Sequence, residues 1–196
     1  MALTRGDIIE LGEHAKKHQN YRVEKVQVEY DIEVMANDIF ASTNRKGRSL
    51  DTIKEHCKRG IVTETAAVMI FGGRRNPQKF DYTNPDTYMW DASLTEKNLL
   101  TEVKWIESDC EWVTYYNDNI KVFKKHHKDL DLFLAAKMND DPSALYYEVS
   151  FVLVANSKTF FDRDYWRPSK GYNDKHFYSH FTSQSSGQCY PINLKK

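Results

Sequence analysis

The chain has 196 residues, of which 40% are hydrophobic and 13% aromatic, and its 28 basic residues balance its 28 acidic residues. This composition predicts one soluble globular domain with a sizeable core, and it excludes disordered and collagen-like chains. The zero net charge excludes a polycation that coats nucleic acids or anionic membranes. Any affinity for nucleic acid must therefore come from local patches or from a bound metal ion.

Several classes of protein are excluded by what the sequence lacks. No apolar stretch reaches the ~20 residues of a membrane span, and the first residues have no signal-peptide core. Cys57, Cys110 and Cys189 lie far apart without a CxxC pair, which is typical of reduced thiols. No phosphate-binding glycine motif occurs, so we expect no nucleotide cofactor. We expect a cytoplasmic protein with no membrane partner.

The first 49 residues carry mainly helical patterns. Thr4–His18 is predicted to be a helix, because Thr4 is a good N-cap with Asp7 three residues later. Val23–Tyr30 alternates like a strand but can equally lead into the next helix. Asp31–Thr43 has apolar residues at helical spacing.

A second helical region follows a basic loop. We expect a helix to start after Ser49 and to break or bend at Gly60. The next segment, Ile61–Phe71, is apolar nearly all round and is followed by two glycines, so it is predicted to be a buried helix. Glu64 is its only charge. Because burying a lone carboxylate is costly, Glu64 needs a metal ion, a lysine or an arginine as partner. A short strand is expected at Lys79–Tyr82.

Two strands, Thr87–Leu94 and Leu99–Ile106, are predicted to form a hairpin with a four-residue loop. Pairing the last residue of the first strand with the first of the second separates an apolar face from a polar one, whereas a one-residue slip mixes them. In this register Asp91 lies opposite Glu102, with Lys104 two residues further on the same side. The apolar face holds Tyr88, Trp90, Ala92, Leu94, Leu99, Thr101, Val103 and Trp105.

The part of the chain that follows the hairpin begins with a helical pattern. Aromatic and aliphatic residues recur at helical spacing from Trp112, so we expect an interrupted helix up to Met138. Leu145–Ala155 is then a long apolar strand covered on both faces. A further strand is expected near Thr159–Asp162, and the remaining residues are irregular.

Glu64, Asp91, Glu102 and Lys104 form the arrangement that points to chemistry. Carboxylates that converge on one point repel one another unless a divalent cation lies between them, and oxygen ligands suit Mg²⁺ or Mn²⁺. A lysine beside them can orient a water molecule or balance charge on a phosphoryl group.

At these residues the chain resembles the PD-(D/E)xK nuclease superfamily, with Asp91 as the strand acid, Glu102-Val103-Lys104 as the ExK motif and Glu64 as the helix acid. The resemblance implies an α/β fold with a restriction-endonuclease-like αβββαβ core, a central mixed sheet flanked by helices. We expect a single domain over 1–196, with a helical N-terminal region (1–49), the nuclease core (50–155) and an irregular C-terminal extension (156–196).

The resemblance further implies a Mg²⁺-dependent endonuclease that hydrolyses phosphodiester bonds of DNA, with Mn²⁺ as a substitute and RNA left open as a substrate. Asp91, Glu102 and the Val103 carbonyl would hold the metal, Glu64 a water of that metal or a second ion, and Lys104 the attacking water. A homodimer is an option if both strands are cut.

Three alternatives stay open. Pro85-Asp86 offers Asp86 as a competitor for the strand acid, although the hairpin register favours Asp91. The chain could also be a catalytically silent relative that binds nucleic acid or protein, with Glu64 in a salt bridge. Finally, it could be an unrelated α/β interaction protein.

Basic residues outside the core motif are candidates for contact with nucleic acid. The candidates are Arg74, Arg75, Lys124, Lys125 and Arg167, although the Lys121–Lys128 run can also be a solvated helix face. His176 and His180 have the spacing of two metal ligands on a helix but lack the glutamate of an HExxH motif.

Overall fold

A computed structural model describes residues 3–42, 47–76, 90–110, 112–116, 130–161, 167–168, 176–180 and 189–192. Its elements in chain order are α1 (Arg5–Lys17), β1 (Tyr21–Glu24), α2 (Lys25–Ala41), α3 (Leu50–Phe71), β2 (Gly73–Arg75), β3 (Ala92–Leu94), β4 (Leu99–Ile106), β5 (Trp112–Tyr116), β6 (Leu132–Asn139), β7 (Tyr146–Asn156), α5 (Ser157–Phe160), β8 (Arg167–Pro168), β9 (His176–His180) and β10 (Cys189–Pro191).

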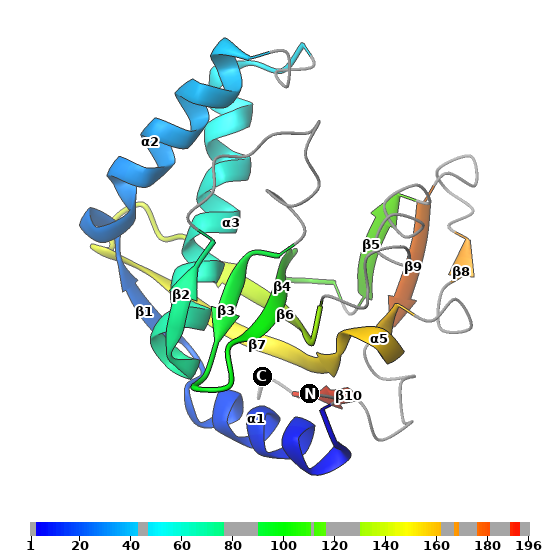
Figure 1. Cartoon of the computed structure of the whole chain (residues 1–196). Coiled ribbons are helices and arrows are strands. Elements are labelled where there is room, and N and C mark those ends of the chain that lie inside the picture. The colour runs from blue at the N-terminus through cyan, green and yellow to red at the C-terminus, as the bar shows by residue number, and fades with distance from the viewer. Residues whose placement is uncertain are drawn as a thin grey trace.

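The fold is mixed α/β, built on a curled seven-stranded sheet (Figure 1). Its strand order is β1-β7-β6-β4-β3-β2, and β10 also pairs with β7. All neighbours are antiparallel except β4 and β6, which are parallel. A separate three-stranded sheet has the order β5-β9-β8. The α/β class and a central mixed sheet flanked by helices are therefore confirmed.

A side-chain cap marks the start of α1, whereas the start of α2 has no side-chain cap bond. The predicted capping box of α1 is confirmed, since Thr4 and Asp7 bond each other's backbone N–H groups. The segment Val23–Tyr30, whose pattern fits either a strand or a helix, is divided between the two: strand β1 ends at Glu24 and helix α2 begins at Lys25. That strand pairs with β7, which no local pattern in the sequence shows.

One continuous helix, α3, replaces the two helical segments expected around Gly60. The predicted break is wrong because Ile53, Cys57 and Ile61 are buried on both sides of the glycine. Their packing offsets the ~0.5–1 kcal/mol that glycine costs in a helix. Ser49 caps the start as predicted, and Gly72, with φ of 73°, ends the helix.

The register of the hairpin is confirmed. Ala92 pairs with Thr101 and Leu94 with Leu99. The apolar face of the hairpin packs against α3. The expectation for Trp90 is wrong, because it packs with the cluster on the other side of the sheet. The chain bends at Asp91, and this bend reverses the alternation before β3. Tyr88 and the predicted strand Lys79–Tyr82 lie outside the described residues.

The helix expected between Trp112 and Met138 is wrong wherever the chain is described, since β5 and β6 are strands. Residues 132–136 form a continuous apolar run, which periodicity alone cannot assign. Pairing of β6 with β4 and β7 decides in favour of a strand. The long strand predicted at Leu145–Ala155 is confirmed as β7. The strand near Thr159 is wrong, because Asn156 caps the short helix α5 there.

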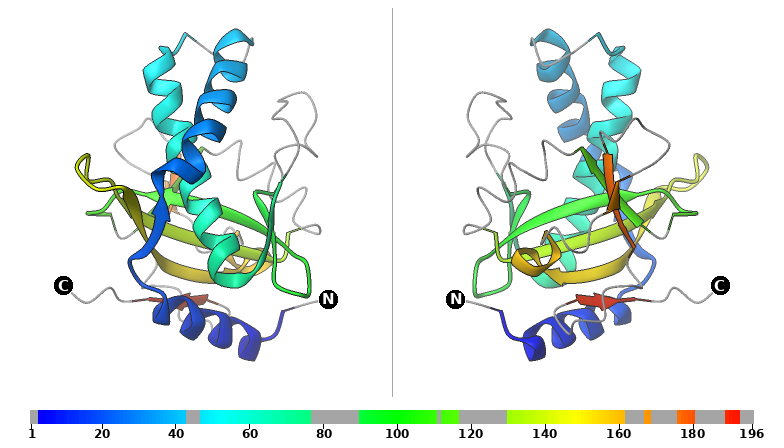
Figure 2. Two further views of the ribbon diagram at one scale, coloured as in Figure 1. Left: turned by 90° about the vertical axis from the view of Figure 1, so that its left-hand side faces the viewer. Right: turned by 90° about the vertical axis from the view of Figure 1, so that its right-hand side faces the viewer.

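Both ends of the chain contribute to the central sheet. Strands β1 and β10 pair with different parts of β7, as the two side views show (Figure 2). The N-terminal region is therefore not only helical, and the C-terminal extension is not wholly irregular. In the part of the chain that the structure describes, no helix combines the length and apolarity that a membrane crossing requires.

Candidate metal centre

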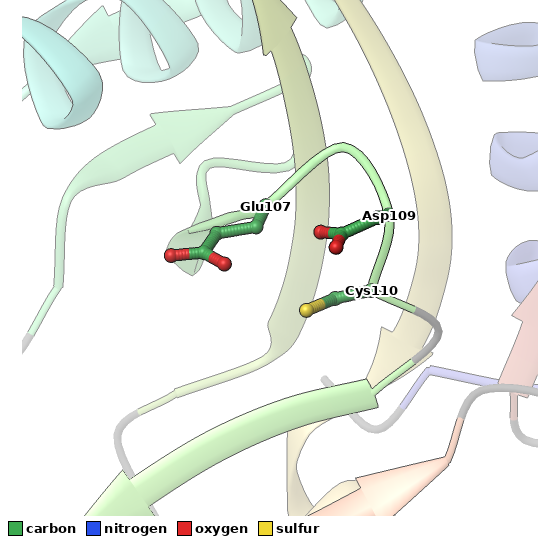
Figure 3. Close-up of side chains that lie close together, drawn as sticks. All are labelled: Glu107, Asp109 and Cys110. Atoms are coloured by element: carbon green, nitrogen blue, oxygen red, sulfur yellow. The ribbon is translucent and has the colours of Figure 1, made fainter.

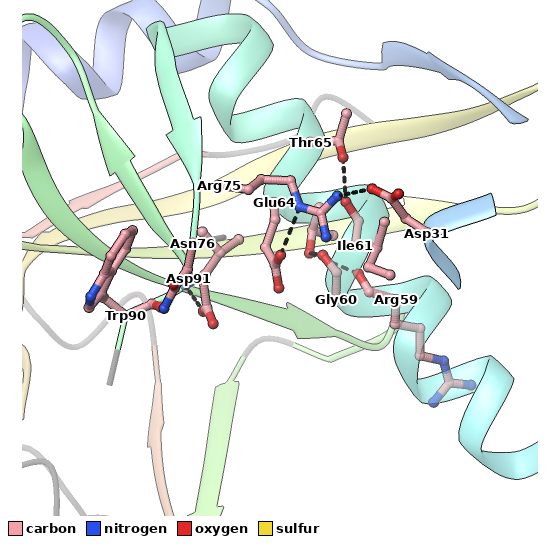
Figure 4. A network of polar contacts seen from close by, with 12 residues as sticks. Asp31, Arg59, Gly60, Ile61, Glu64, Thr65, Arg75, Asn76, Trp90 and Asp91 are labelled. Atoms are coloured by element: carbon pink, nitrogen blue, oxygen red, sulfur yellow. Dashed lines mark hydrogen bonds and ion pairs between the residues drawn. The ribbon is translucent and has the colours of Figure 1, made fainter. Parts of the chain in front are cut away.

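The four predicted motif residues come together where α3 meets the hairpin. Glu64 lies on α3, Asp91 at the bend before β3, and Glu102 and Lys104 on β4. Figure 4 shows the carboxyl groups of Glu64 and Asp91 on the same side of this junction. Asp91 shares a side-chain hydrogen bond with Glu102 and interacts electrostatically with Lys104. The charge of Asp91 also acts on Glu64. The structure therefore places the three carboxyl groups and the Lys104 ammonium group close enough to interact electrostatically, with Asp91 interacting with each of the others.

Asp91 is held in place by two segments, β4 and the residue that follows β2. The backbone N–H of Val103 donates to its Oδ2 at 2.7 Å, and its own N–H donates to the Thr101 carbonyl at 2.8 Å. The N–H of Asn76 donates to the Asp91 carbonyl at 2.7 Å, and the Asn76 amide donates to the Trp90 carbonyl at 2.8 Å. The Val103 bond fixes the Oδ2 atom of the carboxylate, and the other bonds fix the backbone at the bend.

The contact between Asp91 and Glu102 is unfavourable when both are ionised. Glu102 is only 8% exposed. Burial, followed by the charge of Glu102, raises the pKa of Asp91 well above its usual range, although the Val103 N–H opposes this shift. Such a pair is stable when a proton or a cation lies between the carboxyl groups.

Lys104 supplies a positive charge to the same cluster. Burial lowers the pKa of this lysine, and the charges of Glu102 and Asp91 act in the opposite direction. An ammonium group held near two carboxyl groups can donate hydrogen bonds to a water molecule or to a phosphate oxygen.

Glu64 has the partner that a lone carboxylate requires. Arg75 Nε donates to Glu64 Oε2 at 3.2 Å, and Arg75 Nη1 donates to Asp31 Oδ2 at 2.8 Å (Figure 4). Burial and then the charge of Asp91 raise the pKa of Glu64 to about 7, although Arg75 opposes the shift. One turn earlier, a Cβ on Gly60 would lie 3.3 Å from Glu64 Oε1, so the glycine leaves room for this carboxyl group.

The residues predicted to contact nucleic acid, together with Val103 and Asp86, have different outcomes. Arg74 is exposed on β2, whereas Arg75 points inward between two carboxylates. Arg167 lies on β8. Lys124, Lys125 and the rival acid Asp86 lie outside the described residues. Val103 contributes its N–H to Asp91, and its carbonyl as a metal ligand stays a prediction.

The two histidines singled out from the sequence lie on a strand. His176 and His180 are the first and last residues of β9, so the helical spacing inferred for them is wrong.

A second acidic group lies in the turn after β4. Among the described residues, Glu107, Asp109 and Cys110 are the one set of three whose ligand atoms all lie within 4.8 Å of one another (Figure 3). The two carboxylates are exposed and nothing further points to a bound ion there. Glu64, Asp91 and Glu102 do not form so tight a set, and Arg75 holds Glu64.

Sequence reasoning missed two residues that shape this centre. Asn76 ties the Trp90–Asp91 bend to the end of β2, and Asp31 on α2 holds the second side of Arg75. Asp31 and Arg75 are 44 residues apart, and no local pattern reports such a contact. The Asn76 contact depends on the bend at Asp91, which the alternating pattern of the strand conceals.

Comparison of the chain with protein-family models, curated proteins and solved structures gives no match. Function must therefore be inferred from the residues of the chain itself.

Proposed function

We propose that the chain is a metal-dependent endonuclease with a restriction-endonuclease-like core, acting on DNA through Asp91, Glu102, Lys104 and Glu64. The observation that carries this proposal is the hydrogen-bonded contact between the carboxyl groups of Asp91 and Glu102 beside Lys104. Two acids in such a contact favour a cation between them, and Mg²⁺ prefers oxygen ligands of this kind.

The order of the elements supports the same proposal. Helix α3 leads into the antiparallel strands β2, β3 and β4, and a crossover then returns the chain to β6, parallel to β4. This order agrees with the αβββ part of αβββαβ, with β2 in place of the strand expected at Lys79–Tyr82, but no helix lies in the described part of the crossover. The described part of the crossover holds β5.

Each side chain has a role that follows from its surroundings. Asp91 and Glu102, with the Val103 carbonyl, would hold the Mg²⁺. When bound, the ion would stabilise negative charge on the phosphodiester and on the leaving oxygen. Lys104 would orient the attacking water. Glu64, with a pKa of about 7, is suited to hold that water and accept its proton near neutral pH.

Plasmid cleavage tests this function. We expect the protein to nick or linearise supercoiled DNA with Mg²⁺ or Mn²⁺ and to be silent in EDTA. Asp91→Asn and Lys104→Met should each lower the rate at least ~100-fold, since each removes a group that acts on the reacting atoms. Lys137→Met is the matched control, because Lys137 lies on the neighbouring strand β6 and its Nζ donates to the Ser108 carbonyl at 2.6 Å. Full activity in both site variants would contradict the mechanism.

A second candidate, the catalytically silent relative, is favoured by one observation. Arg75 already neutralises Glu64 and is itself held by Asp31, as in a purely structural ion-pair network. This candidate predicts DNA or protein binding without cleavage under every metal condition. Arg75→Met separates the two. If the chain is a nuclease, Arg75→Met releases Glu64, and the variant binds Mn²⁺ at least as tightly as the wild type. If the chain is a silent relative, Arg75→Met lowers the stability, and Mn²⁺ does not stabilise either protein.

A further inference from the structure

Three side chains, Arg48, His56 and Arg59, form a positively charged surface along the first half of α3, here called the α3 basic face. Arg48 Nη1 donates to His56 Nδ1 at 3.2 Å, which requires that ring nitrogen to be unprotonated. The Arg59 guanidinium lies 4.0 Å from the centre of the Trp105 ring. Figure 4 shows Arg59 turned away from the Glu64–Arg75 pair. The α3 basic face is thus separate from that ion pair.

The charges around His56 show that the local potential is positive. Burial and then the charges of Arg48, Arg59 and Lys104 lower the pKa of His56, and only Glu55 raises it. Glu55 is itself ion-paired with Lys58 at 2.5 Å, and Lys58 is also paired with Asp140. A surface where three cations act on one histidine favours an anionic ligand.

Lys104 and Trp105 connect this face to the candidate metal centre. Lys104 acts both on His56 and on the Asp91–Glu102 pair, and Trp105 follows it on β4. The buried Nε1–H of Trp105 donates no hydrogen bond within the described part of the chain, although such donors are usually paired.

We propose that the α3 basic face binds a backbone phosphate of the nucleic-acid strand a few nucleotides away from the phosphodiester that is cut. This inference rests on the proposed function and names the contact that places the strand. Arg59 and His56 precede Glu64 by five and eight residues, or about 7 and 12 Å along the helix axis. At 3.4 Å per nucleotide, these distances correspond to roughly two to four nucleotides. Arg48 and Arg59 would each donate to the phosphate. Because His56 Nδ1 accepts from Arg48, the neutral ring carries its proton on Nε2, and this N–H would be the third donor.

Equilibrium binding without metal tests the contact directly. A fluorescein-labelled 20-base-pair duplex is titrated with the protein in EDTA, and anisotropy is followed from 50 to 200 mM NaCl. We expect Arg59→Gln to weaken binding on the order of tenfold and to lower the slope of log K against log salt by about 1, since one phosphate contact is lost. The loss should be similar for all duplex sequences.

Arg22→Gln is the matched control. Arg22 also stacks on an aromatic ring, 4.3 Å from the centre of Tyr146, but it lies on β1 with Glu148 as partner. We expect it to bind DNA like the wild type. Equal losses in both variants, or an unchanged affinity and salt slope for Arg59→Gln, would overturn the proposal, as would a wild-type protein that does not bind the duplex.

His56 gives a second, independent readout. Wild-type affinity should rise as the pH falls from 8 to 5.5, because phosphate binding favours the protonated ring. His56→Gln should reduce this rise and keep the folded state, since His56 is exposed, while protonation of Glu64, whose pKa is about 7, accounts for the part that remains. An unaltered pH profile in His56→Gln would overturn the role of this residue.

Failure of this inference and failure of the proposed function are distinguishable. Metal-dependent cleavage by a protein whose Arg59→Gln variant binds normally leaves the nuclease and removes the α3 basic face. Binding that depends on Arg59 without cleavage in Mg²⁺ or Mn²⁺ leaves the basic face and removes the nuclease.

Discussion

Two carboxyl groups in contact inside a protein share a proton at neutral pH unless a cation lies between them. Asp91 and Glu102 are in this situation, so their contact costs stability in metal-free protein above the pKa of an unfolded aspartate. Glu102→Gln should therefore raise the melting temperature in EDTA at pH 8. A gain on the order of 1 kcal/mol corresponds to about 2–4 °C for a chain of this size. Calorimetric scans measure it.

The gain should vanish at about pH 2.5, well below the ordinary aspartate pKa of 3.8, because Asp91 is then protonated in both the folded and the unfolded chain. Glu107→Gln provides the control, because it removes an equivalent charge from an exposed turn. An unchanged or lower melting temperature for Glu102→Gln at pH 8 would show that the two acids do not repel each other.

Glu64 makes a separate prediction about pH. Its pKa of about 7 in the folded protein lies above the ordinary value of 4.5, so the folded state keeps a proton that the unfolded state has released. Stability in EDTA should therefore fall as the pH rises from about 4.5 to 7, by at most ~3 kcal/mol for this shift. Urea unfolding of wild type and Glu64→Gln across this range isolates the effect. Parallel curves would contradict it.

At the scale of elements, the turn from α3 into β2 places Arg75 and Asn76. Gly73 has a φ of 124°, and a Cβ there would lie 2.1 Å from the Ser93 carbonyl oxygen. Gly73→Ala should cost several kcal/mol and separate β2 from β3. Gly47→Ala is the control, since Gly47 has a φ of 74° but open space around it and should cost only ~1–2 kcal/mol. Thermal melts that show equal losses would contradict the close approach.

Local patterns and distant contacts explain which elements the sequence predicts. The α1 cap involves residues three apart, and the β3–β4 register follows from alternation across a short loop, so both are predictable. The β6 strand depends on β4 and β7 on either side, and the Asp31–Arg75 pair on two distant segments. The site acids Asp91 and Glu102 are predictable because the hairpin register places them opposite each other. Asn76 and Asp31, which support the site, are not predictable because their contacts join distant segments.

At the scale of the whole molecule, β7 links both ends of the chain to the site. Strand β1 pairs with one half of β7 and β10 with the other, while β6 connects β7 to β4 and Glu102. We expect the central sheet to unfold in one step, with calorimetric and van't Hoff enthalpies equal. Two resolved transitions would contradict a single cooperative unit.

The zero net charge of the chain also has a different meaning at this scale. The acids Asp91 and Glu102 gather at one end of the hairpin, and the α3 basic face lies beside them. Neutrality therefore reflects separated patches of both signs, which permit binding of a polyanion at one place without general coating.

Titration calorimetry with Mn²⁺ tests the central claim, that Asp91 and Glu102 form a divalent-cation site, most directly. The wild-type protein should bind one ion per chain and release protons, detected as a dependence of the heat on the buffer, because Asp91 holds a proton before the ion enters. Glu102→Gln should abolish this binding and Glu107→Gln should leave it intact. Binding that survives in Glu102→Gln, or that is lost only in Glu107→Gln, would contradict the assignment of the metal centre.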